Sequence, residues 1–520
     1  MKYLALFVIL VGSAFAQWPG QAGNLVGHTQ WPGWSGSFNA TACSAPSSGT
    51  NWSNAVVISN CTYSTSSHTT ISCNYCEFIL VDFKSSATND NNAYVTGSNI
   101  IFAGDRFQSN YIQGANVSVT GSNIYFFYDS VVPLVSYVAS PPGSSWPSAG
   151  AGANSTTMSN GVNMATLNQA YEIGIEPNNS SGPMVIDHCD IWGFGNAIQI
   201  LTTTAQITIT SNWIHDGAYP SGVTGGDYHT DGIGYLNGST GPNNVWMIGN
   251  AIATLGNTNS LAFQAATGGY QNIYANENFL SGDNATISWC RPGSVQCTNS
   301  TFYGNTWGAT VAANGPIYSP GSALGTGSVW ACNVVSIPSG TTWTELNSPF
   351  WQPNHSQDGQ FFLNTDPPNS TTDQGSNTYC GIPSPSAINF GNEPSGSTSS
   401  GQTITFSNTN SGTLTFSGVA LVTGTQFTIS SNTCSGTLTA SNTCSITVKF
   451  APTSMGPQTD TLQITTNTPG VSSPQLVPLA GIGTTSTGAT PNLIGPGMKV
   501  SGGTTISRLN PDLPNVSILP

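Results

Sequence analysis

The sequence predicts an all-β protein: a right-handed parallel β-helix followed by an immunoglobulin-like β-sandwich. Three observations support this fold class. The motif VTGSNI begins at Val95 and again at Val119, an offset of 24 residues, and a repeat period in the twenties is typical of a solenoid. A polar residue recurs at one fixed place after such motifs. Short alternating strands with Gly- and Asn-rich turns fill residues 385–484, as in a β-sandwich.

Each repeat has the order apolar, x, apolar, x, x, polar, x, apolar, and its polar residues define a column along the chain. Alternate strand residues face one side, so the apolar ones would form the core and the polar one would fall at the next bend. A buried polar side chain needs hydrogen-bond partners. We therefore expect each member to bond the backbone and its neighbour one coil, about 4.8 Å, away. The predicted column is Asp105, Asp129, Cys189, Asn212, Asn250, Asn278 and Asn305.

Composition divides the chain into five segments. Residues 1–16 have a short apolar run and a small-residue cleavage site, which predicts a signal peptide and a secreted, extracellular or cell-surface protein. Residues 17–70 are rich in Trp and Cys and are expected to cap the N-terminal end of the β-helix, which spans 71–384. Residues 385–484 form the sandwich and 485–520 a flexible tail. No later apolar run reaches about 18 residues, so we expect no transmembrane segment.

Eleven cysteines in a secreted chain predict disulfides. Three pairs are suggested along the chain: Cys290–Cys297, Cys434–Cys444 and Cys332–Cys380. Four N-terminal cysteines are expected to pair among themselves: Cys43, Cys61, Cys73 and Cys76. Cys189 is left over, and its place in the polar column predicts a small buried residue rather than a reactive thiol.

Charge limits the class of partner. Lys and Arg total 7 against 21 Asp and Glu, and only 5% of residues are charged. Nucleic acids and anionic lipid surfaces require a basic surface, so neither is an expected partner. A polyanionic glycan would also need a basic groove, so the expected partner is a neutral or weakly acidic extracellular polysaccharide.

The polar column resembles that of the pectin-lyase-like superfamily of β-helices, over roughly residues 70–340. This resemblance implies the fold and leaves the activity open, because the superfamily includes hydrolases, lyases, esterases, tailspikes and adhesins. The C-terminal segment is similar to the choice-of-anchor D modules of secreted bacterial proteins, through Phe450-Ala-Pro-Thr and Leu479-Ala-Gly-Ile-Gly. That second likeness implies cell-surface attachment rather than catalysis.

The segment His229-Thr-Asp-Gly-Ile is the main candidate for a catalytic motif. It resembles the Asn-Thr-Asp-Gly-Ile motif of polygalacturonase-type glycoside hydrolases, which implies that Asp231 is the catalytic carboxylate. His229 replaces the family's Asn, and the family's Asp-Asp, Gly-His-Gly and Arg-x-Lys motifs have no counterpart here. Inverting hydrolysis needs a second carboxyl group roughly 6.5–9.5 Å away. Asp216 and Asp227 are the nearest in sequence, with His215 and His229 as orienting or proton-transfer groups.

Other interpretations of these residues remain open. Asp216, Asp227 and Asp231 could hold Ca²⁺, which prefers clustered carboxylates and loop carbonyls; no other cofactor is expected. Asp231 also has the parity of the core residues that follow it, so it could cap a turn instead. Further candidate partners by stacking, one coil earlier, are Asp187 and Asp190.

Aromatic residues suggest where a glycan would bind. Trp246, Tyr274 and Tyr303 occupy outward-facing positions on three successive coils and would stack on sugar rings, unless a loop or cap covers them. Tyr228 lies beside the motif. Arg291 is the only Lys or Arg between Arg106 and Lys449, and a lyase would need such a cation to stabilise a carbanion.

The leading hypothesis is therefore a secreted carbohydrate-active enzyme, a glycoside hydrolase or lyase with an acidic site in the β-helix. The alternative is a non-catalytic glycan-binding protein or adhesin of the cell surface.

Overall fold

The computed structural model describes most of the chain between residues 26 and 484. The described ranges are 26–31, 34–87, 90–109, 114–134, 171–178, 182–201, 205–215, 231–235, 242–254, 259–264, 269–276, 278–282, 287–291, 297–303, 305–307, 317–318, 329–331, 333–335, 360–362, 374–375, 381–384, 388–408, 412–467 and 474–484.

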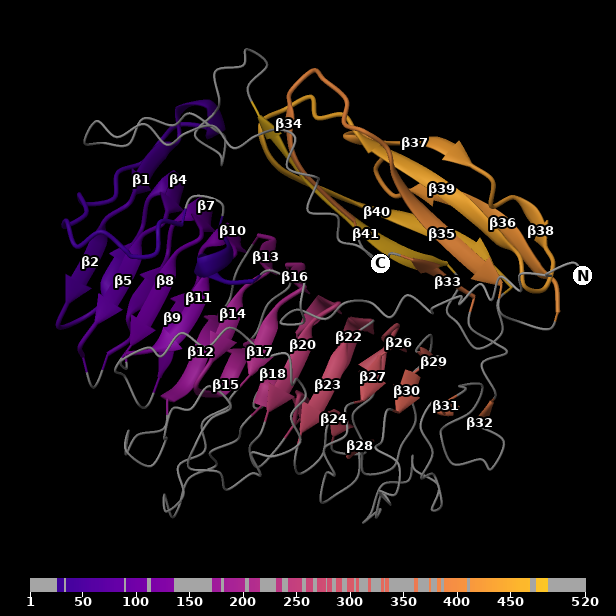
Figure 1. Cartoon of the computed structure of the whole chain (residues 1–520), viewed down its shortest axis with the longest axis horizontal. Coiled ribbons are helices and arrows are strands. Elements are labelled where there is room, and N and C mark those ends of the chain that lie inside the picture. Colours follow the sequence, from indigo (N-terminus) through magenta and orange to yellow (C-terminus); the bar gives the residue numbers. More distant parts are fainter. Residues whose placement is uncertain are drawn as a thin grey trace, which may run out of the picture.

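Three sheets of mainly parallel strands run side by side along the solenoid, and successive coils contribute one strand to each (Figure 1). Sheet 1 contains β1 (Val56–Ser59), β4 (Asn74–Ile79), β7 (Ser98–Ala103), β10 (Ser122–Phe127), β13 (Met184–Asp187), β16 (Ile207–Thr210), β19 (Asn243–Ile248), β22 (Tyr270–Asn276), β26 (Thr301–Tyr303) and β29 (Val329–Ala331), with β25 (Cys297–Thr298) beside β22. Sheet 2 contains β2 (Thr62–Thr65), β5 (Asp82–Ser85), β8 (Arg106–Ser109), β11 (Ser130–Pro133), β14 (Asp190–Trp192), β17 (Trp213–His215), β20 (Ala251–Thr254), β23 (Phe279–Gly282), β27 (Thr306–Trp307) and β30 (Asn333–Val335), then the antiparallel β31 (Gln360–Phe362) and β32 (Gln374–Gly375). Sheet 3 contains β3 (Thr69–Ile71), β6 (Ala93–Val95), β9 (Ala115–Val119), β12 (Tyr171–Pro177), β15 (Phe194–Gln199), β18 (Asp231–Tyr235), β21 (Leu261–Gln264), β24 (Ile287–Arg291) and β28 (Ile317–Tyr318).

Alternate strand residues point inward and stack from coil to coil in one continuous core. The ring of Phe102 lies between those of Phe78 and Phe126, with centroids 5.1 and 4.9 Å away. In sheet 2 the rings of Phe83 and Phe107 stack at 4.7 Å. This inward stacking is the parallel β-helix that the 24-residue repeat predicts.

The predicted polar column is confirmed: every member is fully buried at the bend between sheets 1 and 2. The backbone N–H of Asn212 donates to Oδ1 of Asn250 at 3.0 Å, and its Nδ2 donates to the same oxygen at 2.9 Å. Asn250 and Asn278 repeat this pair of bonds with the next coil, at 2.9–3.0 Å. Cys189 is a free, buried thiol whose backbone N–H donates to Oδ1 of Asn212 at 2.8 Å.

From β4 to β19, the residue at the bend from sheet 1 into sheet 2 has a left-handed conformation that turns the chain sharply. It precedes Val81 in the first of these coils and a column member in the others. These residues are Leu80, Gly104, Tyr128, His188, Ser211 and Gly249, with φ between 53° and 66°. A left-handed conformation costs a non-glycine residue on the order of 1–3 kcal/mol. The ladder of hydrogen bonds holds the bend in place and offsets that strain.

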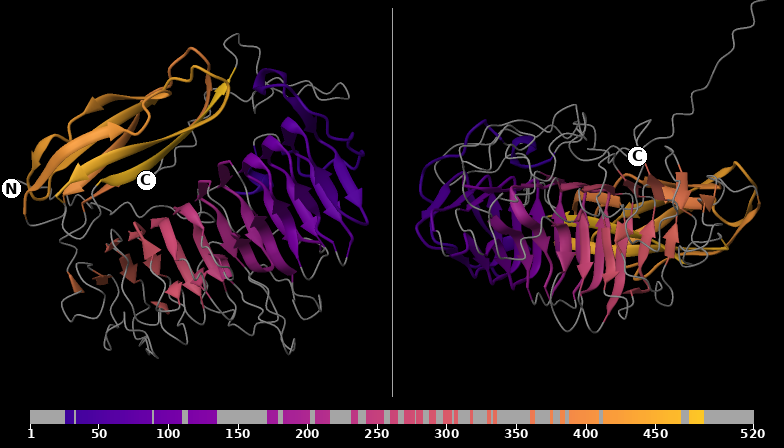
Figure 2. Two further views of the ribbon diagram at one scale, coloured as in Figure 1. Left: turned by 180° about the vertical axis from the view of Figure 1, so that it is seen from behind. Right: turned by 90° about the horizontal axis from the view of Figure 1, so that it is seen from below.

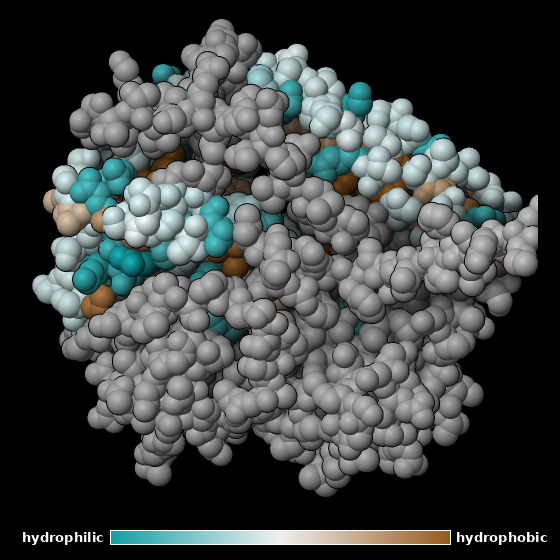
Figure 3. All heavy atoms as spheres, viewed as in Figure 1, coloured by the Kyte–Doolittle hydropathy of each residue, from teal (hydrophilic) through white to brown (hydrophobic). Residues whose placement is uncertain are grey.

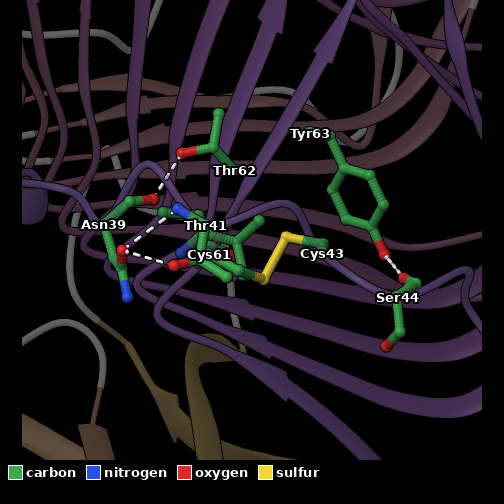
Figure 4. Close-up of a disulfide and its surroundings, with 9 residues drawn as sticks. Asn39, Thr41, Cys43, Ser44, Cys61, Thr62 and Tyr63 are labelled. Carbon is green, nitrogen blue, oxygen red and sulfur yellow. Dashed lines mark hydrogen bonds between the residues drawn. A yellow bond between two sulfur atoms is a disulfide. The ribbon is translucent and has the colours of Figure 1, made fainter. Parts of the chain in front are cut away.

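The start of the first coil is covered by the segment before it. Residues 39–44 run beside β2, where Ala42 pairs in parallel with Thr62. Figure 4 shows the Cys43–Cys61 disulfide that joins the two segments, next to the hydrogen bond from Thr62 Oγ1 to the carbonyl of Asn39 at 2.6 Å. The strands of this first coil begin at Val56, within residues 17–70.

Apolar residues also gather on the outward side of sheet 1, and we call this group the outer cluster. Its members come from the N-terminal segment, from sheet 1 with its bends, and from the sandwich: Trp31, Trp34, Trp52 and Ala55; Val57, Tyr75, Ile79, Leu80, Ile101, Ala103, Tyr125, Phe127, Tyr128 and Val185; and Met455 and Ile482. Two short 3-10 helices, η1 (His28–Gln30) and η2 (Trp52–Asn54), position the N-terminal tryptophans. The N-terminal segment therefore covers a side of the solenoid as well as its end.

The C-terminal module is a sandwich of two sheets. One contains β33 (Gly381–Ser384), β35 (Gln402–Asn408), β39 (Thr443–Phe450) and β37 (Phe427–Asn432). The other contains β34 (Ile388–Pro394), β41 (Gln475–Thr484), β40 (Gly456–Thr466), β36 (Leu414–Leu421) and β38 (Gly436–Leu438). Its own core includes the stacked rings of Phe427 and Phe450, 4.8 Å apart. Figures 1 and 2 show this sandwich beside the solenoid, with one end near the first coils.

The three described disulfides agree with the expected pairs: Cys43–Cys61, Cys73–Cys76 and Cys434–Cys444. The side chains of Cys290, Cys297, Cys332 and Cys380 lie outside what the structure describes. In the part of the chain that is described, no helix is long and apolar enough to span a membrane.

Candidate functional site

Asp231 is the first residue of β18 and is buried, with 1% of its surface exposed. In sheet 3 it pairs with Asn196 of β15 on one side. On the other side, Asn259 donates to Oδ1 of Asp231 from its backbone N–H at 2.9 Å and from its Nδ2 at 3.2 Å. Asp231 thus occupies a corner of the solenoid among buried amides, the position expected of a residue that caps a turn.

The glycine of the same motif is required by packing. A Cβ on Gly232 would lie 2.2 Å from Cγ2 of Ile252, a core residue of sheet 2, and 2.6 Å from the carbonyl oxygen of Ser260. No side chain fits there without movement of the core or the neighbouring strand. The Asp-Gly-Ile part of the motif therefore has a structural explanation that does not involve a substrate.

His215 ends β17 and is buried beside Asp190, on the adjacent strand of sheet 2. Its Nε2 lies 2.8 Å from Oδ1 of Asp190, and its ring lies 4.7 Å from that of Trp213. Asp187 instead lies with its neighbour His188, at 2.9 Å, and accepts a hydrogen bond from Thr210 Oγ1 at 2.7 Å. Asp190 thus contacts His215, and Asp187 contacts His188 and Thr210.

The predicted aromatic stripe is covered at Trp246 and half-covered at Tyr274. Trp246 is 4% exposed, and its indole N–H donates to Asn244 Oδ1 at 2.7 Å. Its ring lies 4.2 Å from that of Tyr274, which is half-buried, and burial raises the pKa of Tyr274. Of the two alternatives left open by the sequence, a covered stripe is the one observed for Trp246.

The remaining candidates fall wholly or partly outside the described residues. Asp216, Asp227, Tyr228 and His229 all lie outside them, so a calcium site or a carboxylate pair with Asp231 is still a prediction. Within the described residues, no group of three or more His, Cys, Asp or Glu side chains is arranged to hold a metal ion.

Two further candidates are described through their backbones alone. Tyr303 ends β26 and Arg291 ends β24, where it pairs with Gln264. In sheet 3, Ile233 pairs with Leu261 and Leu261 pairs with Ile287 on successive strands.

A buried pair near the N-terminus is missed by the sequence reasoning. His28 Nδ1 lies 2.6 Å from Ser130 Oγ, and the backbone N–H of His28 donates to the same oxygen at 3.2 Å. Burial, together with the charge of Arg106, lowers the pKa of His28 to about 3. The signal that could have found it is weak, since His28 belongs to a segment without repeats.

The comparisons with known proteins concern the C-terminal module. Residues 381–473 match the family model "ASH: Abnormal spindle-like microcephaly-assoc'd, ASPM-SPD-2-Hydin". No curated protein matches the chain.

Three solved structures show local likeness. The VesB protease of Vibrio cholerae is 21% identical, over 18% of this chain and 30% of its own, with a TM-score of 0.17. The secreted serine protease VesC from the same organism is 17% identical, over 18% of this chain and 21% of its own, with a TM-score of 0.16. The human CEP192 PapD-like domain 7 is 13% identical, over 22% of this chain and 93% of its own, with a TM-score of 0.18. The chain thus spans under a third of either protease, and these likenesses carry no argument about activity.

Proposed function

We propose that this chain is a secreted protein that binds an extracellular glycan without cleaving it, and that its C-terminal module serves attachment at the cell surface. The observation that carries the non-catalytic part is the burial of Asp231 at a solenoid corner, bonded to Asn259. A catalytic carboxylate must reach the substrate within hydrogen-bond distance. A residue with 1% of its surface exposed is poorly placed for that role.

Disulfides support the export of the chain. The three described ones join residues of the N-terminal segment, the first coils and the sandwich, and such disulfides are typical of proteins that fold in an oxidising compartment. This agrees with the signal peptide expected at residues 1–16.

The surface supports a neutral, polyhydroxylated ligand. Figure 3 shows that the described part of one face is mostly neutral to hydrophilic. Val422, at 56%, is the one large apolar side chain that is exposed among the described residues. Larger apolar patches commonly mark protein-binding sites. A surface of this kind, with little charge, suits hydrogen bonding to sugar hydroxyls.

The test uses the full chain with a panel of insoluble neutral polysaccharides. We expect the protein to sediment with at least one glycan, and the supernatant to gain no new reducing ends. Binding to none of them would contradict the glycan part of the proposal, and release of reducing ends would contradict the non-catalytic part.

A glycoside hydrolase is the second candidate, favoured by the sequence His229-Thr-Asp-Gly-Ile and by the carboxylates of Asp216 and Asp227 in the preceding segment. Separate substitutions Asp216→Asn and Asp227→Asn would test it. Loss of reducing-end release in either variant, against an active wild type, would favour this candidate.

A further inference from the structure

The sandwich packs directly on the solenoid through the outer cluster. Met455 and Ile482 of the sandwich belong to this cluster together with Trp52 of η2. A Cβ on Gly456 would lie 2.1 Å from Cδ1 and Nε1 of Trp52, so the edge of this indole contacts the bare backbone of the sandwich. Figures 1 and 2 show the end of β41 near the first strands of sheet 1.

Glu77 lies among members of the outer cluster on the outward side of sheet 1. It is the outward-facing residue between the core residues Cys76 and Phe78 of β4 and has no exposed surface. Its neighbours on the adjacent strands are Val57 and Ile101, and its neighbours along β4 on the same face are Tyr75 and Ile79. All four neighbours are members of the outer cluster. Neither carboxylate oxygen of Glu77 has a hydrogen-bond partner in the described structure.

We propose that Glu77 makes the docking of the sandwich pH-dependent, so that the sandwich is held on the solenoid in acid and released as the pH rises. An ionised carboxylate without partners is costly to bury. Separation of the sandwich and the N-terminal segment from sheet 1 would give Glu77 access to water and leave the solenoid coils intact. Ionisation therefore favours the separated state.

The direction of the effect follows from the two states. Burial raises the pKa of Glu77 well above its usual value in the docked state, whereas an exposed Glu has a pKa of about 4.3. Docking is therefore strongest below about pH 4.3 and weakens as the pH rises toward the raised pKa. Within that window the docking constant falls by up to about tenfold per pH unit.

The elements that contribute to the outer cluster around Glu77 contain few competing groups. β1, β7, η2, β41 and the turn at residues 451–455 contain no ionisable side chain. The other titratable members of the outer cluster are the phenols Tyr75, Tyr125 and Tyr128, and ordinary phenols ionise near about pH 10. His28, which contacts the cluster member Trp34, has its pKa lowered by burial, so its effect has the opposite sign: acid weakens its packing.

Glu77→Gln keeps the shape and removes the charge, so comparison with wild type isolates Glu77 from His28. The experiment measures, by small-angle X-ray scattering of the full chain, the urea concentration at which the molecule expands at several pH values from 5 to 9. We expect this concentration to fall with pH in wild type relative to Glu77→Gln. Glu176→Gln, on the half-buried Glu176 of sheet 3, is the matched control and should follow wild type.

A second pair of variants tests the contact itself. Gly456→Ala should separate the sandwich at every pH, because its Cβ would overlap Trp52. Gly396→Ala has a similar backbone, φ 88° against 92°, and nothing within 4 Å, so it should stay docked. The proposal is wrong if wild type and Glu77→Gln show the same pH dependence, or if both glycine variants behave alike.

Discussion

Asp129→Asn should stabilise the solenoid at neutral pH. Asp129 is fully buried in the polar column, where four other members are asparagines. Its Oδ1 accepts from the backbone N–H of Asp105 at 2.7 Å, while its Oδ2 has no hydrogen-bond partner in the described structure. Burial and the neighbouring Asp105 raise the pKa of Asp129 well above its usual value.

The magnitude follows from the linkage between protonation and folding. Because the folded-state pKa of Asp129 is raised, its contribution to stability is fully present below the unfolded-state pKa of about 3.9. That contribution is lost as the pH rises toward the folded-state pKa. The loss is about 1.4 kcal/mol per pH unit for each proton involved. An asparagine avoids this loss, and its Nδ2 could add one ladder bond of about 1 kcal/mol, as Asn212 does with Ile186.

Urea denaturation of wild type and Asp129→Asn between pH 4 and 8 measures this effect. We expect the free energies of unfolding to differ by at most about 1 kcal/mol near pH 4 and the advantage of the variant to grow as the pH rises. Asp90→Asn, at a half-buried carboxylate 2.6 Å from His68, is the control for a simple change of charge. Parallel curves for wild type and Asp129→Asn, or a less stable variant at pH 7, would refute the reasoning.

Three further predictions concern the column and the corner. Asn250→Ala removes the acceptor for two buried donors of Asn212, so urea denaturation should show a loss of about 2–6 kcal/mol; a loss below 1 kcal/mol would contradict the ladder. Burial raises the pKa of the Cys189 thiol, so iodoacetamide at pH 8 should leave Cys189 unmodified in the native protein and modify it after unfolding, as read by peptide mass spectrometry; native modification would contradict its burial. Gly232→Ala should cost about 1–3 kcal/mol in the same denaturation assay because its Cβ would overlap Ile252, whereas Gly412→Ala, with nothing within 4 Å, should be nearly neutral; equal effects would contradict the packing at this corner.

The sequence predicts the solenoid well because its signals are local and periodic. The members from Asp105 to Asn305 can be named in advance, since each follows its own strand at the same offset and needs partners only from the next coil. The same reasoning accounts for the unpaired Cys189. The left-handed residues before the column, such as Tyr128 and His188, were not predicted, because most are not glycines.

The environment of the candidate site was harder to predict because it depends on segments far apart in the sequence. Parity suggested that Asp231 could cap a turn, but its contact with Asn259 depends on the register of sheet 3. The burial of Trp246 depends on what covers sheet 1 from outside. The burial of Glu77 could not be predicted for the same reason. Its outward-facing position in a strand predicts an exposed acid, and the outer cluster around it forms only when the N-terminal segment and the sandwich pack on sheet 1.

The most direct test of the central claim is Asp231→Asn in the full chain. The account predicts that this variant folds, because an amide oxygen can still accept from Asn259, and that it sediments with the same polysaccharides as wild type. It also predicts that neither protein releases reducing ends from them. Release by wild type that disappears in Asp231→Asn would contradict the account and identify Asp231 as a catalytic residue.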